Sequence, residues 1–226
     1  MRRTSMQLAA VVLAGGLTVA ACGSVKLGAA AITSQQRISS ATLTDQVANL
    51  NAAYQADTRK GVKPQRAVAQ APQQVLTWLI TFQIYDKLAA QHGISITPAD
   101  VQSQLTALAA QAKQEKVSIA TYISAAGAVP PDLEPQIGRY FAILSAFQNR
   151  LDGGKTPTAQ ARQQALQSRI SHAQCLAAKK LEIMVNPQYG EFDYSSFSVV
   201  PAPSQLAAAP SPSPSASAKP RLKPPC

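Results

Sequence analysis

Hydrophobic residues recur with helical spacing through most of this chain. Four of them fall at i, i+4, i+7 and i+11, on one face of an amphipathic helix: Leu43, Val47, Leu50 and Tyr54. The next segment, from about residue 67 to 91, is apolar on nearly every side, which is typical of a buried helix. Its end is expected at His92-Gly93, because glycine adopts the left-handed conformation that closes a helix.

Capping residues and prolines mark the helices that follow. Thr97, Pro98 and Asp100 supply an N-cap, a proline at the first helical position and an acid at the third, so a helix begins here. Similar starts and stops predict three more helices: 118–127, 130–153 and 156–180.

The residues on either side of this helical region have patterns typical of β-strands. Residues 25–32 are small and apolar and predict a short strand, followed by a turn over 33–40. Near the other end, alternation predicts a half-buried strand at Leu181, Ile183 and Val185. Residues 189–200 predict a further extended segment that returns along the domain. The two strands can pair only if the chain closes on itself. We therefore expect a mostly α fold, a bundle of about five to six helices closed by a small two-stranded sheet from N- and C-terminal strands.

The first residues have the three parts of an export signal. Two arginines give a positive start, residues 8–19 are apolar, and small residues precede Cys22. The tetrapeptide Val-Ala-Ala-Cys that ends at Cys22 resembles a lipobox. Cleavage is therefore expected between Ala21 and Cys22, with a diacylglycerol on the Cys22 thiol. Two acyl chains, at about 0.8 kcal/mol per buried methylene, make a stable anchor.

Two other interpretations of this segment are weaker. A transmembrane helix needs roughly 20 apolar residues, whereas this run is about a dozen and contains Gly15 and Gly16. A signal peptidase site with a chance cysteine is the second alternative. The arginine pair also suggests twin-arginine export, but Thr4-Ser5-Met6 lacks the residues that normally follow. We expect general export and a lipid-anchored protein on the outer, extracytoplasmic face of the cell membrane.

The charge of the exported chain favours anionic surroundings. Removing the signal takes away two of 21 basic residues and none of the 11 acids, which leaves a net charge of +8. Outside the cell the expected anionic partners are phospholipid headgroups and wall polymers. Nucleic acid is not expected, because aromatic residues are too sparse for base stacking. The densest basic cluster lies in a predicted interhelical loop, where a solvated loop is the alternative: Arg59, Lys60, Lys63 and Arg66.

The remaining cysteines do not form a disulfide framework. Cys175 lies within a predicted helix and is expected to be a buried small hydrophobe. Cys226 at the C-terminal end can pair with Cys175 or with another molecule. His172 lies three residues before Cys175 on one helical face, as in a thiolate pair or half of a metal site, although a packed or surface pair is the simpler interpretation. Two ligands do not close a tetrahedral zinc site.

The sequence has no signature of a conventional enzyme. The Gly-Lys-Thr triplet at 154–156 lacks the earlier glycine and the preceding strand of a phosphate-binding loop. Asp132 and Glu134 form a close acidic pair at a helix start, where carboxylates favour the helix dipole. No nucleophile elbow is present. We therefore expect no catalytic residues, metal or cofactor.

The chain divides into four segments. Residues 1–21 are the signal peptide, 22–27 the lipidated anchor and a short linker, and 28–200 one helical domain. Residues 201–226 alternate proline, alanine and serine and predict a disordered tail.

Short motifs occur in a recurring order at 29–32 with 37–39, 74–80 through 88–89, 92–101, and 185–190 with the acids at 191 and 193. A short strand and turn lead into an Arg-Ile-Ser helix entry, and a long helix is followed by a Gly-Ile passage, a threonine and an acid. Over roughly residues 28–200 this order resembles the N-terminal chaperone domain of SurA, the periplasmic foldase, and of related exported foldases. The resemblance implies a fold similar to that domain and to the C-terminal domain of trigger factor.

Two departures limit what the resemblance implies. Residues 33–36 replace the usual Val-Asn-Gly turn, and the stretch 96–156 reads as helices where foldases of this kind carry a parvulin domain. Prolyl isomerase activity is therefore the least expected function.

The resemblance implies a holdase, in which an open helical cradle with apolar and glutamine-rich walls binds unfolded or nascent secreted polypeptides. Trp78, Phe82 and Tyr85 share a helix side and are the candidate binding residues, with plain core packing as the alternative for each. The competing hypothesis is a non-catalytic scaffold subunit that docks on a folded envelope partner. A concave groove favours the holdase, whereas a flat apolar patch of several hundred Å² favours the scaffold.

Overall fold

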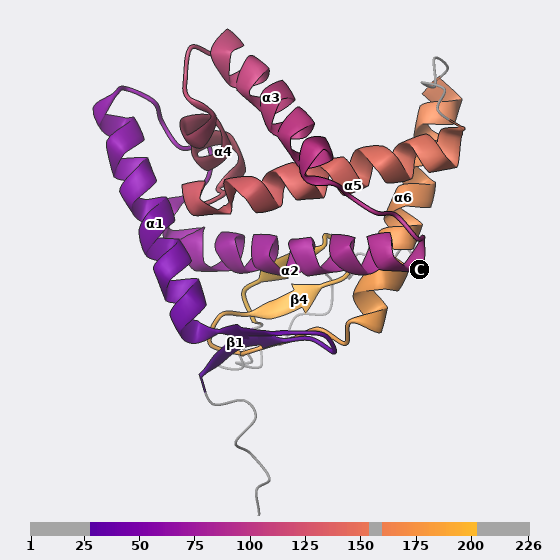
Figure 1. Ribbon diagram of the computed structural model, residues 1–226. Coiled ribbons are helices and arrows are strands. Elements are labelled where there is room, and N and C mark those ends of the chain that lie inside the picture. The colour runs from indigo at the N-terminus through magenta and orange to yellow at the C-terminus, as the bar shows by residue number, and fades with distance from the viewer. Residues whose placement is uncertain (1–27, 154–159, 203–226) are drawn as a thin grey trace, which may run out of the picture.

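A computed structural model describes residues 28–153 and 160–202, and in these ranges the chain is mostly helical (Figure 1). The predicted mostly α class is confirmed. The α-helices are α1 (Ser40–Arg59), α2 (Ala71–Gln91), α3 (Pro98–Gln114), α4 (Ile119–Gly127), α5 (Glu134–Asp152) and α6 (Gln160–Lys180). Two 3-10 turns precede α2 and α5: η1 (Val68–Gln70) and η2 (Pro131–Leu133). Within the described ranges, no helix is long and apolar enough to cross a bilayer.

Several helix boundaries lie where the capping residues predict them, whereas α2 and α5 begin a few residues later than the expected 67 and 130, after their 3-10 turns. Thr97 and Asp100 form the expected capping box, in which each side chain accepts a hydrogen bond from the other residue's backbone N–H. The Thr97 hydroxyl also donates to the Asp100 carboxylate, and this bond, followed by the one from the Thr97 backbone N–H, lowers the pKa of the Asp100 carboxyl below its ordinary value. Ser118 caps α4, and Gly153 ends α5 with a φ of +64°. The predicted start of the last helix, at 156, lies outside the described residues.

Helix α2 is the centre of the fold. It packs against α1, α5, α6 and the strand β5, and Figure 1 shows it between α5 on one side and the strands on the other. Contact on several sides explains why its sequence is apolar nearly all round. Five of its side chains are fully buried: Val75, Leu76, Ile80, Ile84 and Leu88.

The two ends of the chain meet in an antiparallel sheet of order β2-β1-β3. Strand β1 (Ala29–Ile32) pairs with β2 (Arg37–Ser39) on one edge and with β3 (Met184–Val185) on the other. The predicted pairing of N- and C-terminal strands is confirmed. The predicted two-stranded sheet is wrong in one respect, because residues 37–39 form a third strand rather than part of a turn.

The turn between β1 and β2 is consequently shorter than expected. The backbone N–H of Thr33 donates to the carbonyl of Gln36, which closes a four-residue turn. Ser34 in this turn donates through its N–H to the Leu181 carbonyl and through Oγ to that of Lys180. These bonds satisfy carbonyls at the end of α6, so the hairpin is joined to the last helix.

The extended segment predicted at 189–200 forms a second antiparallel pair, β4 (Glu191–Asp193) and β5 (Ser198–Val200). Asp193 accepts hydrogen bonds from the backbone N–H and Oγ of Ser195, which lower the pKa of its carboxyl and fix the turn. The N–H of Val199 donates to Thr77 Oγ1 at 2.8 Å. The pair is therefore fastened to the first half of α2.

A buried acid joins α1 to α4. Asp57 is 3% exposed, and its two carboxylate oxygens accept hydrogen bonds from Thr121 Oγ1 and Ser124 Oγ, each at 2.8 Å. Its backbone carbonyl also accepts the N–H groups of Lys60 and Val62 at the end of α1. The side chain thus holds α4 and the start of the basic loop in place.

Candidate functional site

The three candidate binding residues on α2 lie in different surroundings. Tyr85 is 4% exposed and packs in the core with its ring centroid 4.5 Å from that of Tyr140; burial, followed by the interaction with Tyr140, raises its pKa. Phe82 packs on a second hydrophobic cluster between α3, α4 and α5. Trp78 is half-buried and also lines a pocket. The structure therefore brings only Trp78 of the three to that pocket.

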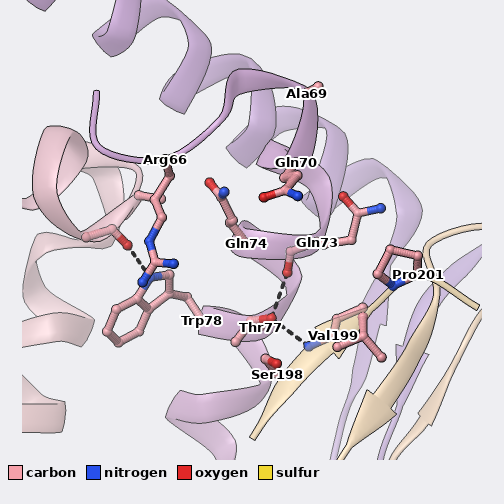
Figure 2. A pocket seen from close by; sticks show the side chains of 13 residues that line it. Arg66, Ala69, Gln70, Gln73, Gln74, Thr77, Trp78, Ser198, Val199 and Pro201 are labelled. Carbon is pink, nitrogen blue, oxygen red and sulfur yellow. Dashed lines mark hydrogen bonds between the residues drawn. The ribbon is translucent and has the colours of Figure 1, made fainter. Parts of the chain in front are cut away.

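This pocket has a volume of about 430 Å³ and lies between the first half of α2, the end of α4 and strand β5 (Figure 2). Trp78 is held in its wall because its Nε1–H donates to the Gly127 carbonyl at 2.8 Å. Thr77 donates to the Gln73 carbonyl and accepts from Val199, which fixes the opposite wall. The lining residues are Arg66, Ala69, Gln70, Gln73, Gln74, Thr77, Trp78, Gly127, Ala128, Ser198, Val199, Val200 and Pro201.

Three glutamines contribute carboxamide groups to the lining. Figure 2 shows the carboxamides of Gln70, Gln73 and Gln74 between Trp78 on one side and the β5 strand on the other. The Oε1 atoms of Gln73 and Gln74 are buried and accept no hydrogen bond within the described residues. A buried acceptor without a donor carries a desolvation penalty, so these two atoms are suited to N–H or O–H donors of a ligand.

A positive charge lies at the rim of the same pocket. Arg66 is exposed, and within the described residues it forms no ion pair. The sequence placed Arg66 in a basic cluster but did not connect it with Trp78. The signal that connects them is spacing: Gln70, Gln74 and Trp78 lie at i, i+4 and i+8, a partly polar stripe along a helix that is otherwise apolar.

The structure shows no arrangement for metal or thiolate chemistry in residues 28–153 and 160–202. No group of three or more histidine, cysteine or acidic side chains there could hold a metal ion. Asp132 lies in the first turn of η2 and Glu134 in that of α5, as expected for helix-start carboxylates. Cys175 is fully buried, as predicted, and is disulfide-bonded, so it has no thiolate to share with His172.

The disulfide partner of Cys175 lies outside the described residues, as do Ala21, Cys22 and the tail beyond residue 202. Because Cys22 is expected to carry the lipid, Cys226 is the expected partner. Mass mapping of the exported chain without reduction should give a peptide pair that joins Cys175 to Cys226. A Cys175 peptide joined to Cys22 would contradict both this pairing and the lipid anchor.

No family model, curated protein or solved structure matches this chain.

Proposed function

We propose that this protein is an exported lipoprotein that binds unfolded secreted polypeptides, as a holdase does, without catalysing a reaction. The observation that carries the proposal is the pocket beside Trp78, where an aromatic ring, two buried oxygen acceptors and a cation line one concave surface. An extended polypeptide offers a matching chemical group for each of these three features. Its backbone N–H groups suit the oxygens of Gln73 and Gln74, its apolar side chains suit the indole, and its acidic groups suit Arg66.

The scaffold alternative has less support. It calls for an extended flat apolar surface, whereas the exposed large hydrophobic residues within the described ranges lie on three different elements: Val68 on η1, Leu176 on α6 and Met184 on β3. Single exposed hydrophobic residues are normal on a monomer. The concave mixed pocket therefore favours polypeptide binding.

Export and lipid anchoring belong to the same proposal. The signal and lipobox pattern support them, as does the disulfide at Cys175, because disulfides persist in oxidising extracytoplasmic compartments. The likeness to the SurA chaperone domain adds support through the order of its elements, in which helices are enclosed by strands from both ends of the chain. In this proposal the helical domain is held at the outer face of the membrane, where secreted chains emerge.

Peptide titration followed by Trp78 fluorescence tests the binding site. Trp78 is the single tryptophan of the chain, so its emission reports on the pocket directly. For residues 23–226 we expect a saturable change with an unstructured peptide of apolar and acidic residues. Replacing Gln73 and Gln74 together by methionine should weaken binding about tenfold or more, because two hydrogen bonds of about 1 kcal/mol each are lost. The unfolding midpoint should fall little, because both oxygens lack donors in the described structure and the bond from Gln74 Nε2 to the Ala67 carbonyl is long, at 3.5 Å, and exposed.

Gln102→Met, on the exposed part of α3, is the matched control and should change neither binding nor stability. The same protein should suppress aggregation of a denatured model enzyme. No fluorescence response and no suppression at several hundred micromolar would rule out the proposed function. An equal loss of affinity in the Gln102 variant would show that the pocket is not the site.

A further inference from the structure

The segment that links α1 to α2 borders a second hollow. This hollow has a volume of about 560 Å³ and lies between the last turns of α1 and the residues that follow it. Its lining residues are Asn51, Tyr54, Gln55, Thr58, Arg59, Pro64 and Val68. None of them lines the pocket beside Trp78, so the two sites are distinct.

Two buried oxygens in this hollow lack hydrogen-bond partners. Tyr54 is only 3% exposed, yet its hydroxyl has no partner within the described residues, and neither has Asn51 Oδ1. Burial raises the pKa of the Tyr54 phenol, and the Arg66 charge opposes this only in part. The phenol is therefore protonated at neutral pH and can donate. The hollow thus offers one O–H donor and one amide acceptor to a ligand.

Four cations at the end of α1 and in the segment after it have no acidic partners within the described residues. Arg59 lines the hollow, and Lys60, Lys63 and Arg66 follow along the chain, all of them exposed. None forms an ion pair within the described residues, where the ion pair is Arg139–Asp86. The nearest acid in sequence, Asp57, is turned inward to Thr121 and Ser124. The positive potential here is therefore not neutralised by the protein.

We propose that this hollow binds a phosphorylated polyol unit of an anionic envelope polymer. The phosphate accepts hydrogen bonds from the Tyr54 hydroxyl and the Arg59 guanidinium, and a polyol hydroxyl donates to Asn51 Oδ1. A simple anion would leave Asn51 without a donor, and a neutral sugar would leave the cations unused. Further phosphates of such a chain match Lys60 and Lys63, which follow Arg59, whereas a single carboxylate matches one of these cations.

The position of the hollow favours a polymer over a lipid headgroup. Helix α1 has 20 residues and begins directly after β2, so at 1.5 Å per residue its other end lies about 30 Å away. Figure 1 shows this far end on the opposite side of the molecule from β1. If the lipid is on Cys22, a few residues before β1, the basic residues lie far from the anchor. The preference for a polymer over a lipid headgroup rests on the export proposed above. The preference for a phosphorylated polyol rests on the residues of the hollow and does not depend on export.

Calorimetric titration of residues 23–226 tests the site. We expect saturable binding of a short synthetic poly(glycerol phosphate) that weakens as salt is raised, and clearly weaker binding of inorganic phosphate. Tyr54→Phe should lower the affinity about tenfold, because it removes one hydrogen bond to a charged group. It should leave the unfolding midpoint unchanged or higher, since that hydroxyl has no partner in the described structure. Arg59→Gln should weaken binding by a similar factor.

Matched controls keep the test specific. Tyr122→Phe removes a tyrosine hydroxyl that bonds to Gln111 outside the hollow, and Lys113→Gln removes an exposed charge on α3; both should change the affinity less than about twofold. Equal losses in the Tyr54 and Tyr122 variants would overturn the site. Equally tight, Tyr54-dependent binding of polyglutamate would overturn the polyol phosphate. Tyr54-dependent binding to phosphatidylglycerol vesicles but not to the polymer would show that the phosphate belongs to a lipid headgroup and would contradict the polymer as ligand.

The measurement is independent of polypeptide binding. Trp78 does not line this hollow, so its fluorescence reports on the other pocket. A chain that binds the polymer but gives no response to peptide would retain this inference and lose the proposed function.

Discussion

Replacing Gly190 by alanine is expected to lower the free energy of unfolding by about 3 kcal/mol. Gly190 is buried directly before β4 and has a φ of +125°, a conformation that residues with a Cβ rarely adopt. A Cβ at this position would lie 2.0 Å from the Val200 carbonyl oxygen. That oxygen belongs to the backbone and cannot rotate away, so β4 and β5 must separate. Phe192 and Val199 then lose their burial in the core.

Gly61→Ala is the control for this prediction, measured in the same denaturant titration. Gly61 also has a positive φ, +81°, but nothing lies within 4 Å of the position of its Cβ. Its replacement should cost only about 1 kcal/mol, from backbone strain alone. Because β5 forms one wall of the pocket beside Trp78, Gly190→Ala should also reduce the peptide response, whereas Gly61→Ala should not. Equal costs for the two variants would contradict the steric argument.

Asp57→Ala is expected to destabilise the fold by about 2–4 kcal/mol. The change removes two charge-assisted hydrogen bonds and leaves the hydroxyls of Thr121 and Ser124 buried without their carboxylate. Helix α4 then loses these two hydrogen bonds to α1 and keeps only its packing against that helix. Asp57→Asn keeps the shape and one acceptor, so its cost should be about half as large. Chemical denaturation followed by circular dichroism measures both.

The matched control is Asp45→Ala, which removes the same charge from an exposed position on the same helix. It should change the free energy of unfolding by no more than about 0.5 kcal/mol. A cost for Asp45→Ala as large as that for Asp57→Ala would mean that helix charge, rather than the buried bonds, determines the effect.

The helices were predictable because their limits are local. Thr97 with Asp100, Ser118 and Gly153 act within one turn of chain, and the structure has them where the sequence placed them. Strand β2 was missed because three residues with one buried side chain, Ile38, are too short to show alternation. The β4–β5 turn carries a local signal, an aspartate with serines two and three residues later, which is typical of a turn closed by a side chain.

The candidate site was less predictable than the fold, for a physical reason. A helix that is apolar on every side has no polar face to show which residues remain accessible, so Trp78, Phe82 and Tyr85 looked equivalent in sequence. Their surroundings differ because α3, α4, α5 and β5 cover different parts of α2. The pocket also depends on β5, which lies more than a hundred residues further along the chain and reaches α2 through the bond between Val199 and Thr77.

The pairing of β1 with β3 limits the order in which this protein can fold. Asn186, next to β3, donates its side-chain N–H to the Ala29 carbonyl, a contact between residues 157 positions apart. In a chain that is exported from its N-terminal end, β3 follows β1 by more than a hundred residues. Until β3 arrives, one edge of β1 has no partner, although the β1–β2 hairpin can already form. Closure is then a late, non-local step, and a chain that stops before residue 184 keeps that edge open.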